Sequence, residues 1–336
     1  MSKITEKIFA IKTESEFEDV ALAVFNLQHE DCLVYRQFCD VLKINPAAIK
    51  SVNDIPFLPI EFFKTHEVRS LTPNPFPEER RTEQSKIFTS SGTGGIQSKH
   101  HVSDVSIYEL SFRKAFEYFY GNIEEYCLLA LLPSYLERDG SSLVYMANDL
   151  IAATKNQDSG FYLHNLNELS EKLKSLLAKR QKIILLGVTY ALLDLAELLS
   201  SPLSGEVIIM ETGGMKGKRK ELLREELHNI FCEKFGVKAI HSEYGMTELL
   251  SQGYSKGNGV FNCPPWMKIL IRDVNDPLKI LDTGKSGGIN MIDLANINSC
   301  SFIATQDLGI LNNDGSFEVS GRFDNSDLRG CNLLVQ

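Results

Sequence analysis

Between residues 84 and 240 the sequence alternates short apolar runs with amphipathic stretches, and this alternation limits the fold classes open to the chain. The amphipathic stretches, such as 103–120 and 218–236, carry apolar residues at helical spacing. The apolar runs typical of buried strands are CLLALLP (127–133), KIILLG (182–187) and EVIIMETGG (206–214). Strands that alternate with helices in this way predict an α/β fold with a largely parallel sheet.

The two ends of the chain have different patterns. Residues 14–43 have apolar positions three and four apart, which predicts a helical region that ends before Asn45-Pro46. After residue 250, short apolar segments alternate with Gly, Asn and Asp turns, and NNDG is a strong hairpin signal. We therefore expect an α/β core with an N-terminal helical segment at 1–250, a β-rich subdomain at 251–320 and a short tail at 321–336.

Composition argues against several classes of function. The 336 residues carry a net charge of −9, whereas a nucleic-acid partner requires a basic footprint. The seven cysteines include no CxxC pair, so we expect neither a disulfide framework nor a zinc site, and reduced thiols predict a cytoplasmic protein. The N-terminal residues lack the apolar run of a signal peptide, and no apolar run is long enough to predict a membrane span.

The stretch FTSSGTGGIQSKHH at 88–101 gathers hydroxyls and glycines before a lysine. It is neither a Walker A loop nor a GxGxxG motif, because both need a glycine where Gln97 stands. Glycine N–H groups can still surround an anion, and hydroxyls add donors. A mobile surface turn is the alternative. The predicted phosphate-binding residues are Ser90, Ser91, Gly92, Thr93, Gly94 and Gly95, with Lys99 as a positive charge.

A second candidate segment, residues 244–248, follows the predicted strand VKAIH. Ligands gather at the carboxyl ends of strands in α/β sheets. Tyr244 could stack on a base, Thr247 could bond a phosphate, and Glu248 could hold Mg²⁺ through oxygen. Gly245 and Met246 lie between them. The alternative is a tyrosine packed under a turn and a glutamate at a helix N-terminus.

Two weaker signals complete the set. Gly213 and Gly214 end a predicted strand and permit a flat ligand to approach the backbone, although a tight turn explains them equally well. Asp307 could accept hydrogen bonds from two ribose hydroxyls, and the guanidinium of Arg322 could bond phosphate or ribose oxygens. Both residues could also be solvated parts of a hairpin.

The order of these segments resembles that of the acyl-adenylate-forming superfamily, which activates carboxylic acids with ATP. SSGTGG, a two-glycine strand end, YGMTE, TQDLG and GRFD follow one another along the chain. More closely, IPFLPIEFFKTHEV, FTSSGTGGIQSKHHV, SEYGMTE and GRFDNSDLRGCNLLV are similar to the acyl-protein synthetases of bacterial bioluminescence, the LuxE family. A more distant similarity is to phenylacetate–CoA ligases. The resemblance extends from about residue 55 to the end.

The resemblance implies an adenylating domain of mixed and parallel sheets flanked by helices, with ATP and Mg²⁺ as cofactors. It assigns the glycine loop and Lys99 to the β- and γ-phosphates, Thr247 to the α-phosphate and Glu248 to Mg²⁺. Tyr244 and residues 213–214 are assigned to adenine. Asp307 and Arg322 are assigned to ribose.

The resemblance also bears on the end of the chain. Full-length adenylating enzymes carry a C-terminal lid domain with a catalytic lysine after the GRxD motif, whereas 336 − 322 leaves 14 residues after Arg322. Acyl-protein synthetases transfer the acyl group from acyl-AMP to a cysteine near their own C-terminus, and Cys331 matches that position. They then hand it to a reductase partner. An unremarkable thiol on a frayed tail is the alternative reading of Cys331.

Three functions stay open on the sequence. An acyl-protein synthetase acting on a carboxylic acid, with a fatty acid preferred, is the first. A short CoA ligase or acyl-carrier-protein ligase is the second, and a non-catalytic nucleotide-binding subunit is the third because the lid domain is largely missing. His100 and His101 are expected to be loop residues, and His241 a strand-end residue beside the site.

Overall fold

The computed structural model describes residues 2–71, 85–90, 96–132, 140–162, 164–203, 205–213 and 223–323. Its α-helices are α1 (Lys3–Ile8), α2 (Glu14–Asp31), α3 (Leu33–Val41), α4 (Phe62–Thr65), α5 (Val105–Tyr120), α6 (Ser142–Ala153), α7 (Leu166–Ala178), α8 (Thr189–Leu198) and α9 (Arg224–Phe235). Short 3-10 helices are η1 (Pro46–Ala48), η2 (Val52–Asp54), η4 (Ile123–Glu125) and η5 (Leu294–Asn296). The strands are β1 (Leu58–Pro59), β2 (Lys86–Thr89), β3 (Lys99–Val102), β4 (Tyr126–Leu131), β5 (Gly160–Phe161), β6 (Lys182–Gly187), β7 (Val207–Glu211), β8 (His241–Tyr244), β9 (Gly253–Ser255), β10 (Val260–Asn262), β11 (Met267–Arg272), β12 (Ser286–Asp293), β13 (Phe302–Leu311) and β14 (Phe317–Arg322).

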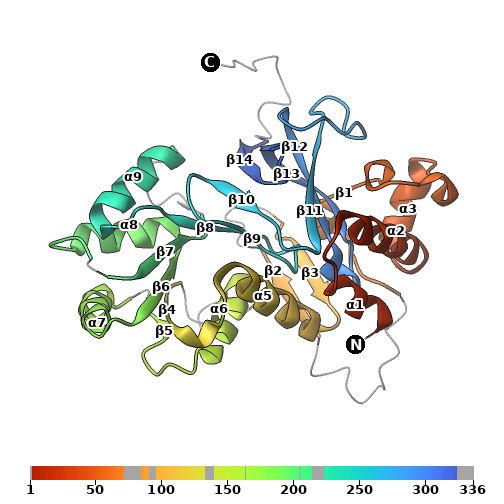
Figure 1. Ribbon diagram of the computed structural model, residues 1–336. Coiled ribbons are helices and arrows are strands. Elements are labelled where there is room, and N and C mark those ends of the chain that lie inside the picture. Colours follow the sequence, from red (N-terminus) through yellow and green to blue (C-terminus); the bar gives the residue numbers. More distant parts are fainter. Residues whose placement is uncertain are drawn as a thin grey trace.

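A 12-stranded sheet runs through the middle of the molecule, with α7, α8 and α9 at one end and α1, α2 and α3 at the other (Figure 1). Its order is β11-β12-β13-β14-β10-β9-β8-β7-β6-β4-β5, and β1 pairs with β13. The five strands from β8 to β5 are parallel. This arrangement confirms the α/β fold with flanking helices that the sequence predicts.

The strands from β9 to β11 are antiparallel and continue the same sheet. β8 and β9 pair across the expected boundary at residue 250, with Glu243 opposite Tyr254. The parallel and antiparallel parts of the sheet therefore meet at β8. Tyr244 ends β8 at this juncture, and the turn to Glu248 follows it.

The helical region predicted at 14–43 forms two helices, α2 and α3, and α1 precedes them. A capping box between Thr13 and Glu16 begins α2. The chain takes an extended conformation at Cys32, which separates α2 from α3. The buried Gln28 side chain donates to the carbonyls of Asn296 and Ile297, both at 3.0 Å. These helices are thereby fixed onto the segment that contains η5.

Three local predictions need correction. His100 and His101, expected in a loop, lie on β3, which pairs with β2 in a separate antiparallel hairpin. The helix expected at 218–236 begins at Arg224, and Gly236 ends it in the left-handed conformation with φ of 70°. The strand expected at VKAIH begins only at His241, because Gly236 must first reverse the chain.

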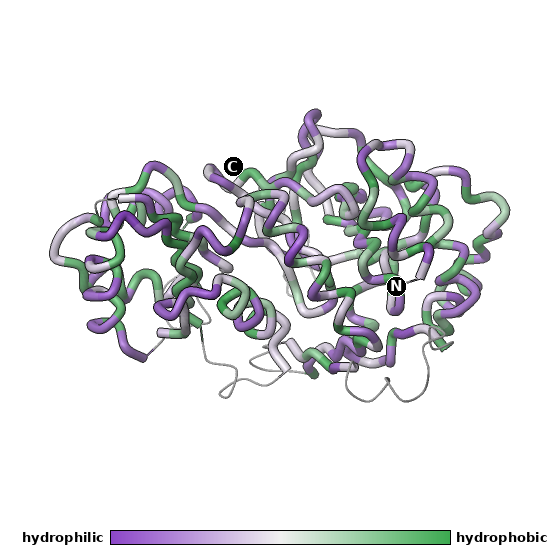
Figure 2. The backbone as a smooth tube through the Cα atoms, turned by 60° about the horizontal axis from the view of Figure 1, so that its bottom comes forward, coloured by the Kyte–Doolittle hydropathy of each residue, from purple (hydrophilic) through white to green (hydrophobic). Residues whose placement is uncertain are grey.

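Hydrophobic and hydrophilic residues alternate along the helices at both ends of the molecule (Figure 2). This is the pattern of helices with one face on a core. Within the described ranges, none of the helices has the length and apolar character needed to cross a bilayer.

Candidate nucleotide-binding site

Three predicted residues from three strands form one hydrogen-bonded group. The hydroxyl of Tyr244 on β8 donates to Asp307 Oδ2 at 2.7 Å. Arg322 Nε on β14 donates to Asp307 Oδ1 at 2.9 Å, and the two residues are register partners in the β13–β14 pair. Each carboxylate oxygen accepts one of these bonds and keeps a second lone pair. Asp307 can therefore receive two further hydroxyls, the number that a ribose offers.

Aromatic packing fixes the position of Tyr244. Its ring lies 5.8 Å from the ring of Phe261 and 5.5 Å from that of Phe317, and these two phenylalanines stack on each other. Burial, and then the charge of Asp307, raise the pKa of Tyr244 well above its ordinary value. Tyr244 is therefore a neutral donor with its ring set at the end of β8.

Glu248 is buried on the same turn. Burial raises the pKa of its carboxyl, while a hydrogen bond from Ser98 and the charges of Arg322 and Lys64 act in the opposite direction. No helix follows Glu248 among the described residues, so it is not a helix N-terminal acid. Arg322 and Lys64 therefore favour the ionised form of Glu248, which is the form that can ligate a cation.

Buried polar groups from distant segments hold the turn that carries Thr247 and Glu248. His100 Nδ1 on β3 lies 2.8 Å from the Thr247 carbonyl and donates to it. Asn296 Nδ2 on η5 donates to the Glu248 carbonyl at 2.7 Å. Asp293 Oδ2 accepts two N–H groups just beyond this turn, from Leu250 at 2.7 Å and Ser251 at 2.9 Å. The turn is thus fixed through its backbone, so the Thr247 and Glu248 side chains are not needed to hold it.

His100 corrects the expectation of a loop residue. It lies fully buried in β3, where burial lowers its pKa to about 4, so it is neutral and donates through Nδ1. His101 points to the other face and lies 3.3 Å from Glu67. His241, expected at the end of the strand VKAIH, is instead the first residue of β8, and the Tyr120 hydroxyl lies 3.2 Å from its Nδ1.

Gly213 lies two residues beyond the end of β7, and it has φ of +71° and open space where a Cβ would stand. The preceding Glu211 is buried and accepts bonds from His228 at 3.0 Å, Thr189 at 3.1 Å and Ser242 at 3.2 Å. Because Glu211 pairs with Ser242 in register, Gly213 lies level with the end of β8. The carboxyl ends of two parallel strands therefore form one edge of the site.

The base of the glycine loop faces Glu248. Ser98 N–H donates to Ser90 Oγ at 3.0 Å, and Ser90 N–H donates to the Ser98 carbonyl at 3.1 Å. Lys99 is exposed and lies between the two buried residues Ser98 and His100, so it points to the opposite face of β3. The predicted residues Ser91, Gly92, Thr93, Gly94, Gly95, Gly214 and Cys331 lie outside the described residues.

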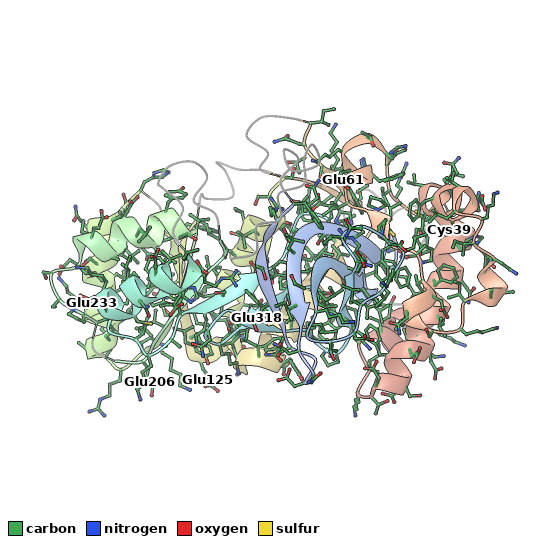
Figure 3. The ribbon with its side chains drawn as sticks, turned by 90° about the horizontal axis from the view of Figure 1, so that it is seen from above. Cys39, Glu61, Glu125, Glu206, Glu233 and Glu318 are labelled. Atoms are coloured by element: carbon green, nitrogen blue, oxygen red, sulfur yellow. The ribbon has the colours of Figure 1, made fainter. Side chains whose placement is uncertain are left out.

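Helix α4 covers the site from a direction that the sequence did not indicate. Its Phe63 packs edge-on against His100 with ring centroids 5.5 Å apart. Glu61 at its start, labelled in Figure 3 at the ends of the C-terminal strands, accepts from Gln306 at 2.5 Å. The exposed Lys64 makes no ion pair with another described residue, although its charge acts on Glu248. Lys64 is therefore a cation at the mouth of the site.

The residues present fit a magnesium ion that arrives with a nucleotide. Within the described part of the chain, no three His, Cys, Asp or Glu side chains cluster in a way that would hold a metal. Mg²⁺ is commonly bound through one or two carboxylates together with substrate phosphates. Glu248 is the carboxylate in the right place for that arrangement.

The mixed sheet with its flanking helices is that of the adenylate-forming ligases. 2-Hydroxyisobutyryl-CoA ligase with 2-HIB-AMP has a TM-score of 0.66 at 14% identity, covering 94% of this chain and 70% of the other. ATP-bound MatB from Rhodopseudomonas palustris has a TM-score of 0.52 at 18% identity, covering 70% and 47%. The chain thus spans about half the length of MatB. At these identities the neighbours define the fold.

The family follows from the sequence itself. The model of the family described as "Acyl-protein synthetase, LuxE" matches residues 10–336, and the chain belongs to that family. No curated protein matches the sequence significantly. The predicted family and fold are both confirmed.

Proposed function

We propose that this protein activates a carboxylic acid with ATP to give an acyl-AMP and pyrophosphate. The observation that carries the proposal is the group formed by Tyr244, Asp307 and Arg322, which offers a base-stacking ring and two free carboxylate lone pairs. Glu248 lies on the turn that begins at Tyr244, where Mg²⁺ and the phosphates would follow the nucleoside. Family membership and the ligase fold support the same reaction class.

The reaction requires the protein mainly to position the reactants and to neutralise phosphate charge. A carboxylic acid is already ionised at neutral pH, so it attacks the α-phosphorus without a general base. The carboxylate oxygen forms the new P–O bond, and the bond to pyrophosphate breaks. Mg²⁺ on Glu248, when bound, would neutralise phosphate charge, and Thr247 would hydrogen-bond the α-phosphate. The fixed backbone of this turn keeps both side chains in place without reorganisation.

The positive charge for pyrophosphate has two candidate sources. The glycine loop with Lys99 is the source proposed from the sequence, and the loop base beside Glu248 supports a phosphate role for the loop. Lys99 itself is on the far face of β3, so it would reach the phosphates only around the edge of the hairpin. Lys64 is on the near side and acts on Glu248. We therefore propose that Lys64 neutralises part of the phosphate charge.

The second half-reaction would transfer the acyl group to a thiol. A thiolate attacks the acyl carbonyl, the thioester bond forms and AMP leaves. The described cysteines at 32, 39, 127, 232, 263 and 300 are poor candidates, because burial raises the pKa of each one. Cys331 is the cysteine that remains, and Arg329 would stabilise its thiolate.

The substrate, acceptor and setting belong to the same proposal. A fatty acid is the preferred substrate, an acyl-CoA reductase-like protein or an acyl carrier protein would take the acyl group, and the cytoplasm would be the compartment. No nucleic-acid partner is proposed. CoA as the acceptor, or nucleotide binding without catalysis, are the competing functions.

Pyrophosphate–ATP exchange across acids from acetate to palmitate, with an aryl acid added, tests the proposal. Exchange with at least one acid is expected, and exchange with none would reject the enzyme in favour of a nucleotide-binding subunit. Labelled acid should then remain on the protein after denaturation. Cys331→Ser should lose this label and keep exchange, with Cys232→Ser as the matched control. Label that survives in Cys331→Ser would reject self-acylation alone.

A further inference from the structure

Strand β13 is irregular at the point where it carries Asp307. Strands β12 and β13 lie side by side in the C-terminal part of the sheet (Figure 1). Between two regularly paired stretches, residues 305–307 of β13 lie opposite the single residue Ile289 of β12. We call these three residues the β13 bulge. Bulges disrupt the hydrogen-bond ladder and redirect side chains next to active sites, so the backbone groups here need partners from outside the ladder.

Arg272, the last residue of β11, supplies partners to both sides of the bulge. Its Nη1 donates to the Ile289 carbonyl at 2.7 Å, and its Nη2 donates to the Thr305 carbonyl at 2.5 Å. Nη1 also donates to Asn290 Oδ1 at 2.9 Å. The planar guanidinium presents these donors in a fixed arrangement, so one side chain spans the two strands where the ladder is interrupted.

Arg272 is a costly residue to bury at this position. Its side chain is buried and makes no ion pair with another residue in the described part of the chain. Burial lowers the pKa of Arg272, while the charges of Glu61 and Asp307 act in the opposite direction, so the guanidinium lies within the field of the predicted ribose ligand. An apolar side chain would pack here at less cost but could not bond the carbonyls of the bulge.

The neighbouring residues leave room for the guanidinium and cover it. Gly288 is the register partner of Arg272, and a Cβ built on this glycine would stand 2.6 Å from Arg272 Cζ. Phe323 lies over the guanidinium, with its ring centroid 5.5 Å from Cζ. The Phe323 N–H also donates to the Gln306 carbonyl in the bulge at 2.8 Å. The residue that follows Arg322 is thus fixed to the same bulge.

Thr305 links Arg272 to Asp307. The Thr305 carbonyl accepts from Arg272, and the Thr305 hydroxyl donates to the Ile289 carbonyl at 2.9 Å. The same hydroxyl accepts the N–H of Asp307 at 3.1 Å. Two hydrogen bonds therefore lead from the guanidinium to the Asp307 backbone. A shift of Arg272 would move the Asp307 carboxylate relative to Tyr244.

We propose that Arg272 is a positioning residue, which holds the β13 bulge so that the Asp307 carboxylate meets the ribose hydroxyls of the nucleotide. Arg272 acts through Thr305 and not by contact with the nucleotide. The inference rests on the proposed function, because it takes Asp307 as the ribose ligand.

Two substitutions disturb Arg272 in different ways. Gly288→Ala places a methyl group at the guanidinium, and the three atoms nearest to this methyl all belong to the far end of the Arg272 side chain. This end can move aside, so the variant should fold with Arg272 displaced from the bulge carbonyls. Arg272→Met removes the donors altogether. Gly160→Ala on β5, where the nearest atom to the added methyl lies at 3.6 Å, is the matched control.

The measurement is the ratio of the dissociation constant of 2′-deoxy-ATP or 3′-deoxy-ATP to that of ATP, obtained by isothermal titration. For one of these analogues the wild-type ratio should be about 10-fold or more, because a hydrogen bond to a charged group is lost. Gly288→Ala and Arg272→Met should each lower this ratio by about 3-fold or more, since a hydrogen bond weakens steeply when it is misaligned. Arg272→Lys, which keeps donors and charge, should recover part of the ratio lost in Arg272→Met. Gly160→Ala should keep the wild-type ratio.

The ratio separates a positioning role from a merely structural one. If Arg272 only stabilised the fold, its variants would melt at lower temperature and keep the wild-type ratio. A wild-type ratio in Gly288→Ala would overturn the role of Arg272 and leave the proposed function standing, and this variant decides the question even where Arg272→Met fails to fold. Wild-type protein that binds ATP and both deoxy analogues equally would reject the ribose assignment, and this inference with it. Wild-type protein that binds no ATP would reject the proposed function itself.

Discussion

Replacing Asp307 with asparagine should weaken nucleotide binding far more than it weakens the fold. The fold loses little because the Arg322 side chain is 72% exposed, so that solvent screens its pair with the buried Asp307. The amide oxygen of asparagine can still accept from Tyr244. The nucleotide loses more, because the amide NH₂ turns a donor toward a ribose hydroxyl where a charged acceptor stood. A hydrogen bond to a charged group contributes about 1.5–3 kcal/mol.

That range corresponds to an increase in the dissociation constant for ATP of about 10- to 150-fold. Isothermal titration with ATP, 2′-deoxy-ATP and 3′-deoxy-ATP measures it as a double-mutant cycle. For wild-type protein, removing the hydroxyl that Asp307 binds should raise the dissociation constant of the nucleotide. For Asp307→Asn the same removal should raise it little further. Asp282→Asn, at a surface pair of the same β-rich region, is the matched control. If Asp307→Asn loses as much affinity for both deoxy analogues as for ATP, the ribose assignment is wrong.

Four other substitutions test the surroundings of the site. Glu248→Gln should abolish most exchange. Because burial raises the Glu248 pKa, the affinity of wild-type protein for Mg²⁺·ATP should begin to fall at a pH above the ordinary carboxyl pKa. Titrations of the variant should show no such fall. His100→Phe keeps the ring against Phe63 but leaves the Thr247 carbonyl without a donor, which should cost about 1–3 kcal/mol in urea unfolding and lower exchange. Burial opposes ionisation of Glu211, but the hydrogen bond and charge of His228 outweigh it and lower the Glu211 pKa. Glu211→Gln should therefore be less stable than wild type at neutral pH. The difference in unfolding free energy should shrink as the pH falls through that lowered pKa. Lys64→Ala should raise KM for ATP several-fold without changing the melting temperature, and Lys50→Ala should do neither; an unchanged KM would remove Lys64 from the site.

The sequence predicts the fold well where one principle dominates. Apolar runs such as KIILLG and EVIIMETGG become β6 and β7, since a strand covered by helices on both faces has little choice of structure. The motif order also indicates that Tyr244, Asp307 and Arg322 serve one ligand, and the structure brings these three together. Such segments are recognisable because each carries its own local signal.

The hairpin of β2 and β3 could not be predicted in the same way. KHHV is short and polar, and its burial comes from contacts with α4 and with the turn at Thr247, not from its own pattern. A single sequence does not distinguish a buried histidine that donates to a carbonyl from an exposed one. The orientation of Lys99 depends on this strand, so the sequence alone could not predict that Lys99 lies on the far face.

The N-terminal helices acquire a role in the site through a chain of buried amides. Gln28 on α2 donates to the Asn296 carbonyl and accepts from the Ser301 N–H at 2.9 Å, which fixes the segment containing η5 from both sides. Asn296 in turn donates to the Glu248 carbonyl. Each of these groups is buried, so breaking one bond leaves its partner unsatisfied instead of hydrated. The position of the proposed magnesium ligand therefore depends on a helix about 220 residues away in sequence, a dependence that local patterns do not contain.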